Sequence, residues 1–345
     1  KSPKCSNMRL GLLVVGGMSV LLVAAVLFML YTRGQRGGKP LAEAPTLGYL
    51  SEDTKLILAW NPSAADSSKE ARELMERIGF ANGGNLDPNA IFGVKLDQVE
   101  DVVVGLNPNP IPDFRVIVRT KSSYDADGIR NKLGRTGSKQ LGTKTVDTLA
   151  LPWLPRWLPV EPVLWCATPR TLIICSRADD MQKIPDEPRA NPDHLPAPIV
   201  ELLKHRSDRD SFLWLVGYSE DWSKTLFALL KIPAEQRKTL FKVQSVGLAL
   251  RPDSGKITSR ARPARVTETV TPEGSGVALD LVATTRTDED ALDLRTLLDN
   301  WFDALKLDVR DSNLKETRFS ATIAGSPKEF EQIVRTLRTL GKKNK

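Results

Sequence analysis

Hydrophobic residues occur along this chain in two patterns: one long uncharged run, and a series of shorter stretches with strand or helix spacing. The long run covers residues 10–31, LGLLVVGGMSVLLVAAVLFMLY. As a helix it would extend about 33 Å, enough to cross the ~30 Å hydrocarbon core of a bilayer. It is longer than the apolar part of a signal peptide, and it ends without a pair of small residues for cleavage. We therefore expect an uncleaved transmembrane helix.

The residues on either side of this run set the expected topology. A short basic tail, residues 1–9, precedes it, and a stalk rich in glycine and charge, residues 32–48, follows it. Three lysine or arginine residues flank the run on each side, so the positive-inside rule does not fix the orientation. The short leading tail and the long trailing region favour an extracytoplasmic C-terminal part. We thus expect a single-pass protein of the cell (inner) membrane that contacts the bilayer through residues 10–31.

Shorter apolar stretches after the stalk predict an α+β module over residues 49–183. Helices are expected from Ser67, which would form a capping box with Glu70, and from near Ser123. Strands are expected at residues 54–60, 99–106, 113–120 and 143–149. The resulting order, βαββαβ, is that of the ferredoxin-like fold. A hairpin over residues 162–177 would extend the sheet.

A second module with the same order is expected over residues 199–341. A connector with five prolines, residues 184–198, leads into it, and a basic tail, residues 342–345, ends the chain. Its strands are expected at residues 211–218, 243–250, 277–285 and 317–323. Its helices are expected over residues 222–242, from Thr287 and from Ser326.

The two modules also share a short stretch of sequence. Residues 119–133 align with residues 284–298 at positions that include Thr120 with Thr285 and Asp125 with Asp290. The predicted fold class is therefore α+β: an N-terminal transmembrane helix followed by two ferredoxin-like modules related by an internal duplication.

The formal net charge of +7 suggests a nucleic-acid partner, but its distribution along the chain does not. Residues 1–40 carry six basic and no acidic residues, and residues 342–345 carry three more basic ones. The region between them holds 40 basic and 42 acidic residues and is near neutral. A nucleic-acid-binding domain carries its basic surface on the fold itself, so we expect no nucleic-acid partner.

The sequence contains no recognisable reactive motif. The histidines, His194 and His205, lie apart from other metal ligands, and no stretch matches a phosphate-binding loop, a dinucleotide-binding turn or a nucleophile elbow. Acidic pairs such as Asp288 and Asp290 are more typical of solvated helix starts than of acid–base sites. We therefore expect no catalytic, cofactor-binding or metal-binding residues.

One apolar loop is a candidate contact site. The segment LPWLPRWLP, residues 151–159, has three prolines and cannot form a regular helix. Its side chains Trp153, Leu154 and Trp157 would contact a protein partner or the membrane surface, where tryptophan is common. Alternatively, the loop folds back as a lid over its own sheet, since large aromatic residues are more often buried.

Cys166 and Cys175 lie on the two strands of the expected hairpin. With its turn at residues 169–170, the hairpin pairs Cys166 with Ile173 and Cys175 with Leu164. The two sulfur atoms would then share a face of the sheet as diagonal neighbours, usually too far apart for a disulfide. We expect two small buried hydrophobic residues instead.

Several stretches resemble a known group of proteins. The chain is similar to uncharacterised single-pass membrane proteins of planctomycete-type bacteria, through a lone anchor followed by LGYLSEDT, VVVGLNP, VIVRTKSSYDADGIRNKL and VLWCATPRTLIICS. In some of those relatives, a similar extracytoplasmic region follows a Ser/Thr kinase. The resemblance implies no catalytic residues, because the group has none assigned.

These features predict a membrane-anchored extracytoplasmic protein that binds or scaffolds a partner, such as another protein, without catalysis. The alternative is the sensor region of a kinase-linked membrane signalling protein whose cytoplasmic part lies outside this sequence.

Overall fold

Strands in this chain differ in how deeply they are buried, and the difference follows a gradient across one sheet. In the computed structural model, every residue of β1 (Leu56–Trp60, LILAW) and β7 (Thr171–Cys175, TLIIC) is buried. By contrast, β4 (Arg135–Leu141) and β11 (Asp308–Lys315) are polar and mostly exposed. Strands covered on both faces are apolar throughout, whereas edge strands carry polar residues. The composition of these strands therefore follows their position in the sheet.

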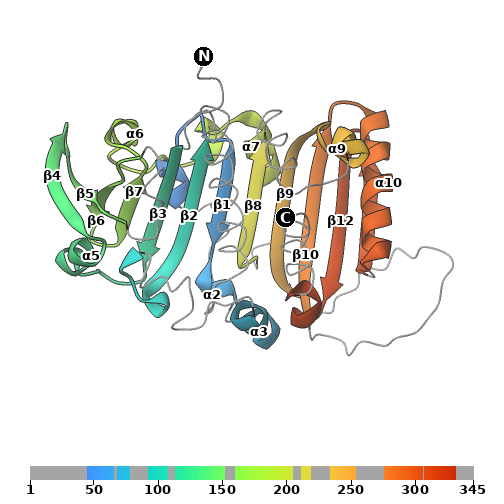
Figure 1. Cartoon of the computed structure of the whole chain (residues 1–345), viewed down its shortest axis with the longest axis horizontal. Coiled ribbons are helices and arrows are strands. Elements are labelled where there is room, and N and C mark those ends of the chain that lie inside the picture. The colour runs from blue at the N-terminus through green and yellow to red at the C-terminus, as the bar shows by residue number, and fades with distance from the viewer. Residues whose placement is uncertain are drawn as a thin grey trace, which may run out of the picture.

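The structure describes residues 45–65, 68–77, 92–107, 113–151, 160–204, 211–218, 234–253, 276–305 and 307–331. Among them, twelve strands form one antiparallel sheet in the order β11-β12-β10-β9-β8-β1-β2-β3-β7-β6-β5-β4 (Figure 1). The remaining strands are β2 (Val99–Asn107), β3 (Asp113–Thr120), β5 (Lys144–Leu149), β6 (Val163–Thr168), β8 (Leu213–Tyr218), β9 (Val243–Asp253), β10 (Gly276–Thr285) and β12 (Arg318–Gly325).

Short helices pack on both faces of this sheet. One face is covered by α2, α3 and α5 and, over β10 and β12, by α10; the other is covered by η2, α6 and α7. The α-helices are α2 (Pro62–Ala65), α3 (Lys69–Arg77), α5 (Ala126–Lys132), α6 (Ala178–Gln182), α7 (Ala197–Lys204), α9 (Ala234–Leu240) and α10 (Asp288–Ala304). The 3-10 helices are η2 (Pro45–Tyr49), η3 (Leu96–Gln98) and η4 (Pro192–His194).

Alternating side chains of the central strands build a core on each face. In β1, Leu56 and Leu58 join the cluster under α2, α3 and α5, whereas Ile57 and Ala59 join the cluster under η2, α6 and α7. This alternation is the two-residue period of a strand. A third cluster, under α10, extends the first one through Leu279, which packs against both.

The strand order is symmetric about the pair of β1 and β8. Leu58 lies opposite Leu215 in the middle of that antiparallel pair. From β1 the sheet continues through β2, β3 and β7, and from β8 it continues in the same way through β9, β10 and β12. The two halves of the chain therefore meet strand to strand and contribute to one sheet.

Two threonines make the same hydrogen bonds in the two halves. The Thr120 hydroxyl, at the end of β3, lies 3.2 Å from Arg170 O, and the Thr285 hydroxyl, at the end of β10, lies 3.2 Å from Thr317 O. The backbone N–H of each threonine donates to the same carbonyl. These carbonyls belong to the turns that lead into β7 and β12, so the two strands occupy equivalent places.

The predicted fold class, a transmembrane helix followed by two ferredoxin-like modules, is wrong. In a split βαβ unit, the helix crosses over and leaves the strands on either side of it parallel. Here β2 returns beside β1 as its antiparallel neighbour, with Leu58 opposite Val104. Moreover, α3 packs over β9 and β10 of the other half of the chain. One continuous antiparallel sheet therefore replaces the two separate modules.

The predicted transmembrane, single-pass architecture is also not found in the described helices. No helix in the part of the chain that the structure describes is long and apolar enough to cross a membrane. The longest of them, α10, carries six carboxylates. Residues 10–31, to which the prediction refers, lie outside the described residues. Contact with a bilayer and localisation at the inner membrane stay predictions.

The predicted cysteine hairpin forms, but in a different register. Cys166 lies opposite Leu172 and Cys175 lies opposite Val163, with a β-bulge between Cys166 and Thr168. A shift of one residue moves a side chain to the other face of a sheet. Cys166 packs against the core under α5, and Cys175 belongs to the core under α6. The two thiols are free and on opposite faces, so the expected shared face is wrong.

Most apolar strands lie where the sequence predicts them, whereas the polar elements were missed. β3 spans the predicted residues 113–120, but β4 and β11 have too few apolar residues to give a strand pattern. Within residues 184–198, expected as a connector, Leu195 is buried and α7 begins at Ala197.

Candidate functional site

Charged residues inside an apolar strand mark the candidate site. β3 reads DFRVIVRT, so Asp113 and Arg115 alternate with Phe114 and Val116. Asp113 is 8% exposed and Arg115 is 2% exposed. A buried charge without a partner is costly, so each of these side chains requires a counter-charge nearby. Asp113 and Arg115 are each other's counter-charge, and Asp53, in the segment that precedes β1, is a second anion near Arg115.

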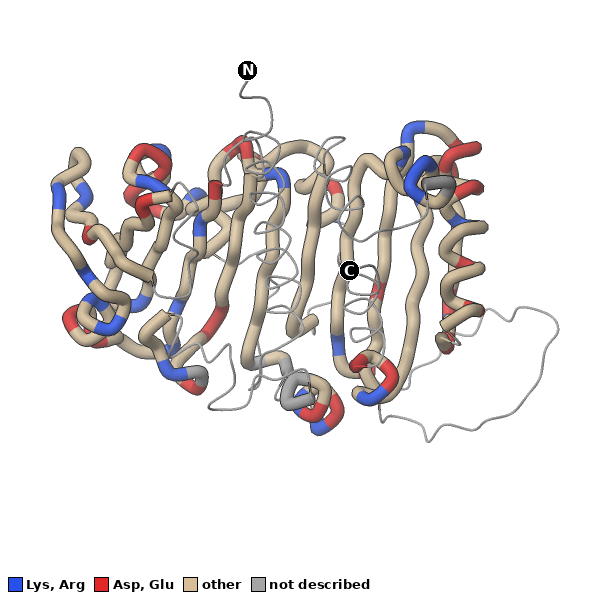
Figure 2. Tube along the Cα trace, viewed as in Figure 1, with Lys and Arg blue, Asp and Glu red and all other residues tan. Residues whose placement is uncertain are grey.

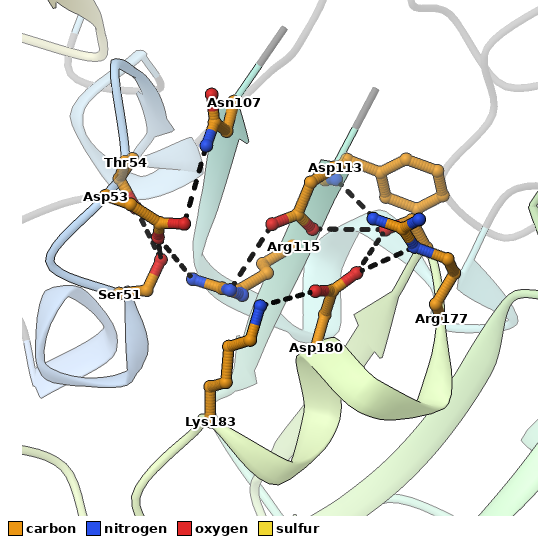
Figure 3. A network of polar contacts seen from close by, with 11 residues as sticks. Ser51, Asp53, Thr54, Asn107, Asp113, Arg115, Arg177, Asp180 and Lys183 are labelled. Atoms are coloured by element: carbon orange, nitrogen blue, oxygen red, sulfur yellow. Dashed lines mark hydrogen bonds and ion pairs between the residues drawn. The ribbon is translucent and has the colours of Figure 1, made fainter. Parts of the chain in front are cut away.

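Arg115 lies at the centre of the polar network in Figure 3. Its Nη2 atom lies 3.4 Å from Asp113 Oδ2, and its Nη1 atom lies 3.8 Å from Asp53 Oδ1. Asp53 in turn accepts hydrogen bonds from the Ser51 hydroxyl and, at 3.4 Å, from Asn107 Nδ2. Strong charge-assisted hydrogen bonds measure about 2.7–2.9 Å. Arg115 thus lies between two carboxylates, and both of its ion-pair distances are longer than those of a strong charge-assisted hydrogen bond.

Ser176 links this network to α6. Its hydroxyl oxygen lies 3.1 Å from Asp113 Oδ1 and 3.1 Å from Asp180 Oδ2. Asp180 is also bound by Lys183 Nζ at 3.1 Å and by Arg177 Nε at 3.2 Å. Asp180 therefore has two close cations, from the residues that cap the two ends of α6, whereas Asp113 has only the longer contact with Arg115.

Burial and neighbouring charges shift the two carboxyl groups in opposite directions. Burial raises the pKa of Asp113; Arg115 opposes this effect, and the nearby Asp180 adds to it. Burial also acts to raise the pKa of Asp180, but hydrogen bonds from Lys183 and Arg177 outweigh it and lower that pKa. Of the two, Asp113 is the carboxyl group that retains a proton more readily.

The thiol of Cys175 borders this network but is not arranged as a nucleophile. Its side chain is fully buried, and burial raises the pKa of the thiol although Arg115 partly opposes this. A reactive cysteine requires an accessible thiolate. Cys175 therefore packs in the core as a neutral thiol.

A second charged network stabilises the end of the sheet at β4. Asp147 is 2% exposed and lies 2.7 Å from Arg130 Nε and 3.0 Å from Arg135 Nε. The Ser138 hydroxyl donates to the same carboxylate, and Arg130 also pairs with Asp127 at 2.9 Å. These bonds connect α5 with β4 and β5, so the network has a structural role.

Among the described residues, no cluster of three or more His, Cys, Asp or Glu side chains could hold a metal ion. His194 places Nδ1 3.1 Å from Asn191 O, and His205 lies outside the described residues.

The predicted contact residues Trp153, Leu154 and Trp157 also lie outside the described part of the chain. Leu151, just before them, is buried. A partner or membrane contact at that loop stays a prediction.

The outward face of α10 is the second feature with functional potential. Thr287 caps this helix, and its hydroxyl accepts the Asp290 N–H at 3.1 Å. Leu294, Leu298 and Phe302 face the sheet. Leu292 points away from it and is 55% exposed.

Carboxylates are frequent along the surface of α10, and Asp288 and Glu289 lie one helical turn before Leu292. α10 has six carboxylates and one arginine, and Figure 2 shows the acidic positions along its length. Lys242 pairs with Asp290 at 2.7 Å and with Asp293 at 3.2 Å, on one side of the helix. Other acidic residues of the helix, Asp288, Glu289 and Asp303, are exposed. The outward face therefore combines a negative charge with an apolar centre.

Sequence reasoning missed both features, although each leaves a signal. For the network, the signal is an arginine inside the apolar strand pattern of β3. For α10, it is Leu292, which falls outside the buried stripe at helical spacing. The signal in β3 does not identify the partners of Arg115, because Asp53 is distant from it in sequence.

Comparisons of this chain with protein-family models, with curated proteins and with solved structures find no match. The resemblance to planctomycete-type membrane proteins stays a prediction, and the site is interpreted from its own geometry.

Proposed function

We propose that the protein acts by binding, and that the outward face of α10 holds a basic amphipathic helix of a protein partner. The observation that carries this proposal is the exposure of Leu292 within a carboxylate-rich helix face. Among the described residues, the exposed large apolar side chains are Leu292 at 55% and Leu305, the C-cap of α10, at 41%. Both belong to the same element.

Two features of α10 lower its own stability, which favours a role in binding. An exposed leucine does not gain the roughly 1.5–3 kcal/mol of folding free energy that full burial of such a side chain contributes. Asp303 lies in the last turn, where the negative end of the helix dipole repels a carboxylate, and that turn contains no basic residue. Local features that cost stability are expected at functional surfaces.

The chemistry of this face specifies the partner. A helix with an apolar stripe and flanking lysine or arginine side chains would cover Leu292 and neutralise Asp288, Glu289 and Asp303. The proposal does not depend on residues 10–31, whose contact with a membrane stays a separate prediction.

A peptide-binding measurement tests this proposal. The full chain is titrated against a fluorescent synthetic amphipathic helix of leucine and lysine, and anisotropy is recorded. We expect saturable binding that weakens as salt rises above about 0.1 M, because the Debye length then falls below ~10 Å. Leu292→Ala should weaken binding about tenfold, since it removes roughly 1.4 kcal/mol of apolar burial.

Charge variants provide the matched control. The triple variant Asp288→Asn/Glu289→Gln/Asp303→Asn should weaken binding, whereas Asp97→Asn/Asp179→Asn/Glu187→Gln, which removes exposed charges elsewhere, should not. Equal losses in the two triple variants, or unchanged binding by Leu292→Ala, would show that α10 is not the binding surface.

A further inference from the structure

We propose that Asp113 and Asp180 share one proton through the hydroxyl of Ser176, with Asp113 as the neutral acid. This proton stabilises the packing of α6 against the ends of β3 and β7. The arrangement makes the packing of α6 sensitive to pH. It goes beyond the proposed binding function and does not depend on it.

The hydrogen-bond inventory around Ser176 requires an additional proton. The hydroxyl lies 3.1 Å from Asp113 Oδ1 and 3.1 Å from Asp180 Oδ2, and it accepts the N–H of Phe114 at 3.4 Å. A serine hydroxyl has one hydrogen and accepts two. With both carboxylates ionised, it can donate to only one, and the other contact places two acceptors together without a hydrogen. A proton on one carboxyl group completes all three bonds.

The neighbouring charges decide which carboxyl group holds that proton. Lys183 and Arg177 lie within 3.2 Å of Asp180 and keep it ionised. Asp113 is buried and has Arg115 at 3.4 Å. Asp113 therefore donates to Ser176, which donates to Asp180.

Charged and titratable groups face Asp113 from every packed element. Arg115 comes from β3, Cys175 from the end of β7, Asp180 from α6, and Asp53 from the segment before β1. With Asp113 neutral, Arg115 retains Asp53 at 3.8 Å as its ionised partner.

The direction of the pH dependence follows from the raised pKa of Asp113. The folded protein binds this proton more tightly than the unfolded chain, so its contribution is complete below the ordinary aspartate pKa of about 3.9. The contribution is lost as pH rises through the raised pKa. Within that window, the folding equilibrium constant falls by up to about tenfold for each pH unit. Asp180, with its lowered pKa, contributes in the opposite direction: its stabilisation is lost as pH falls through that pKa.

The test is urea unfolding of the full chain at several pH values, with three variants. Asp113→Asn keeps a neutral donor toward Ser176, so it should be at least as stable as the wild type at neutral pH. It should also lack the wild-type loss of stability with rising pH. Asp180→Asn should be less stable at neutral pH, because Lys183 and Arg177 lose their anion. Asp179→Asn, an exposed neighbour, should behave like the wild type.

A carbon NMR titration of aspartate carboxyl groups supplies a second readout. The resonance missing from Asp113→Asn should titrate above the ordinary aspartate range in the wild type. The proposal is overturned if Asp113→Asn is less stable than the wild type or fails to fold, because the ionised carboxylate is then required. A normal titration of that resonance would overturn it as well.

Discussion

Single residues carry two kinds of information in this chain, local and long-range. Helix caps are local, and the sequence places two of them correctly: Thr287 caps α10, and Ser326 caps the helix expected to begin there. The cap of α3 differs from the predicted Ser67, because Ser68 accepts the Ala71 N–H at 3.1 Å. The buried networks are long-range, because Asp113 meets its partner Ser176 only when β3 pairs with β7. A pattern read along one strand shows that a buried charge exists but not which residue neutralises it.

The equivalent threonines give a prediction at the residue scale. Thr120→Val and Thr285→Val each remove a buried hydroxyl that lies near two backbone carbonyls and can donate to one of them at a time, at 2.6 and 3.2 Å for Thr120 and at 2.9 and 3.2 Å for Thr285. We expect each variant to lose about 1–2 kcal/mol of unfolding free energy, measured by urea denaturation. The exposed Thr145→Val serves as control and should change it by less than about 0.5 kcal/mol. A loss in only one of the two variants would contradict the equivalence of the two threonines.

The sequence locates the apolar strands of the fold, whereas it does not locate the polar ones. The edge strands β4 and β11 each carry charges and a β-bulge, features that prevent pairing with other chains. Because of these charges, neither strand shows the apolar alternation from which a strand is predicted. The prolines of residues 184–198 predict a connector, and in the structure the backbone of this segment approaches η2 closely at Arg189. Tertiary contacts, which no local pattern encodes, decide these elements.

A pair of glycine variants tests that close approach. A Cβ atom on Gly48, in η2, would lie 2.4 Å from Arg189 O and 2.5 Å from Arg189 N. Because backbone cannot yield as a flexible side chain does, we expect Gly48→Ala to lose about 1–3 kcal/mol in a thermal or urea unfolding measurement. Gly137→Ala, on β4, meets nothing within 4 Å and should be neutral or slightly stabilising. Equal stability of both variants would mean that η2 does not pack on this segment.

The observed architecture differs from the two predicted modules because β1 pairs with β8. The sequence shows two similar series of strands and helices, and from these alone two modules are the natural interpretation. The pairing of β1 with β8 joins both series into one sheet, and α3 then packs on strands of the other half. Both strands are strongly apolar, as central strands are, but an apolar run does not specify its partner.

Amide hydrogen exchange of the full chain, followed by mass spectrometry, tests the single sheet most directly. Every amide group of β1 and β8 lies between two paired strands, whereas β4 and β11 each have one neighbour among the described strands. We predict that peptides from β1 and β8 exchange among the slowest in the chain and that peptides from β4 and β11 exchange fastest of the strands. Exchange of β1 or β8 as fast as that of β4 would contradict the account, because it would place them at the edges of two separate modules.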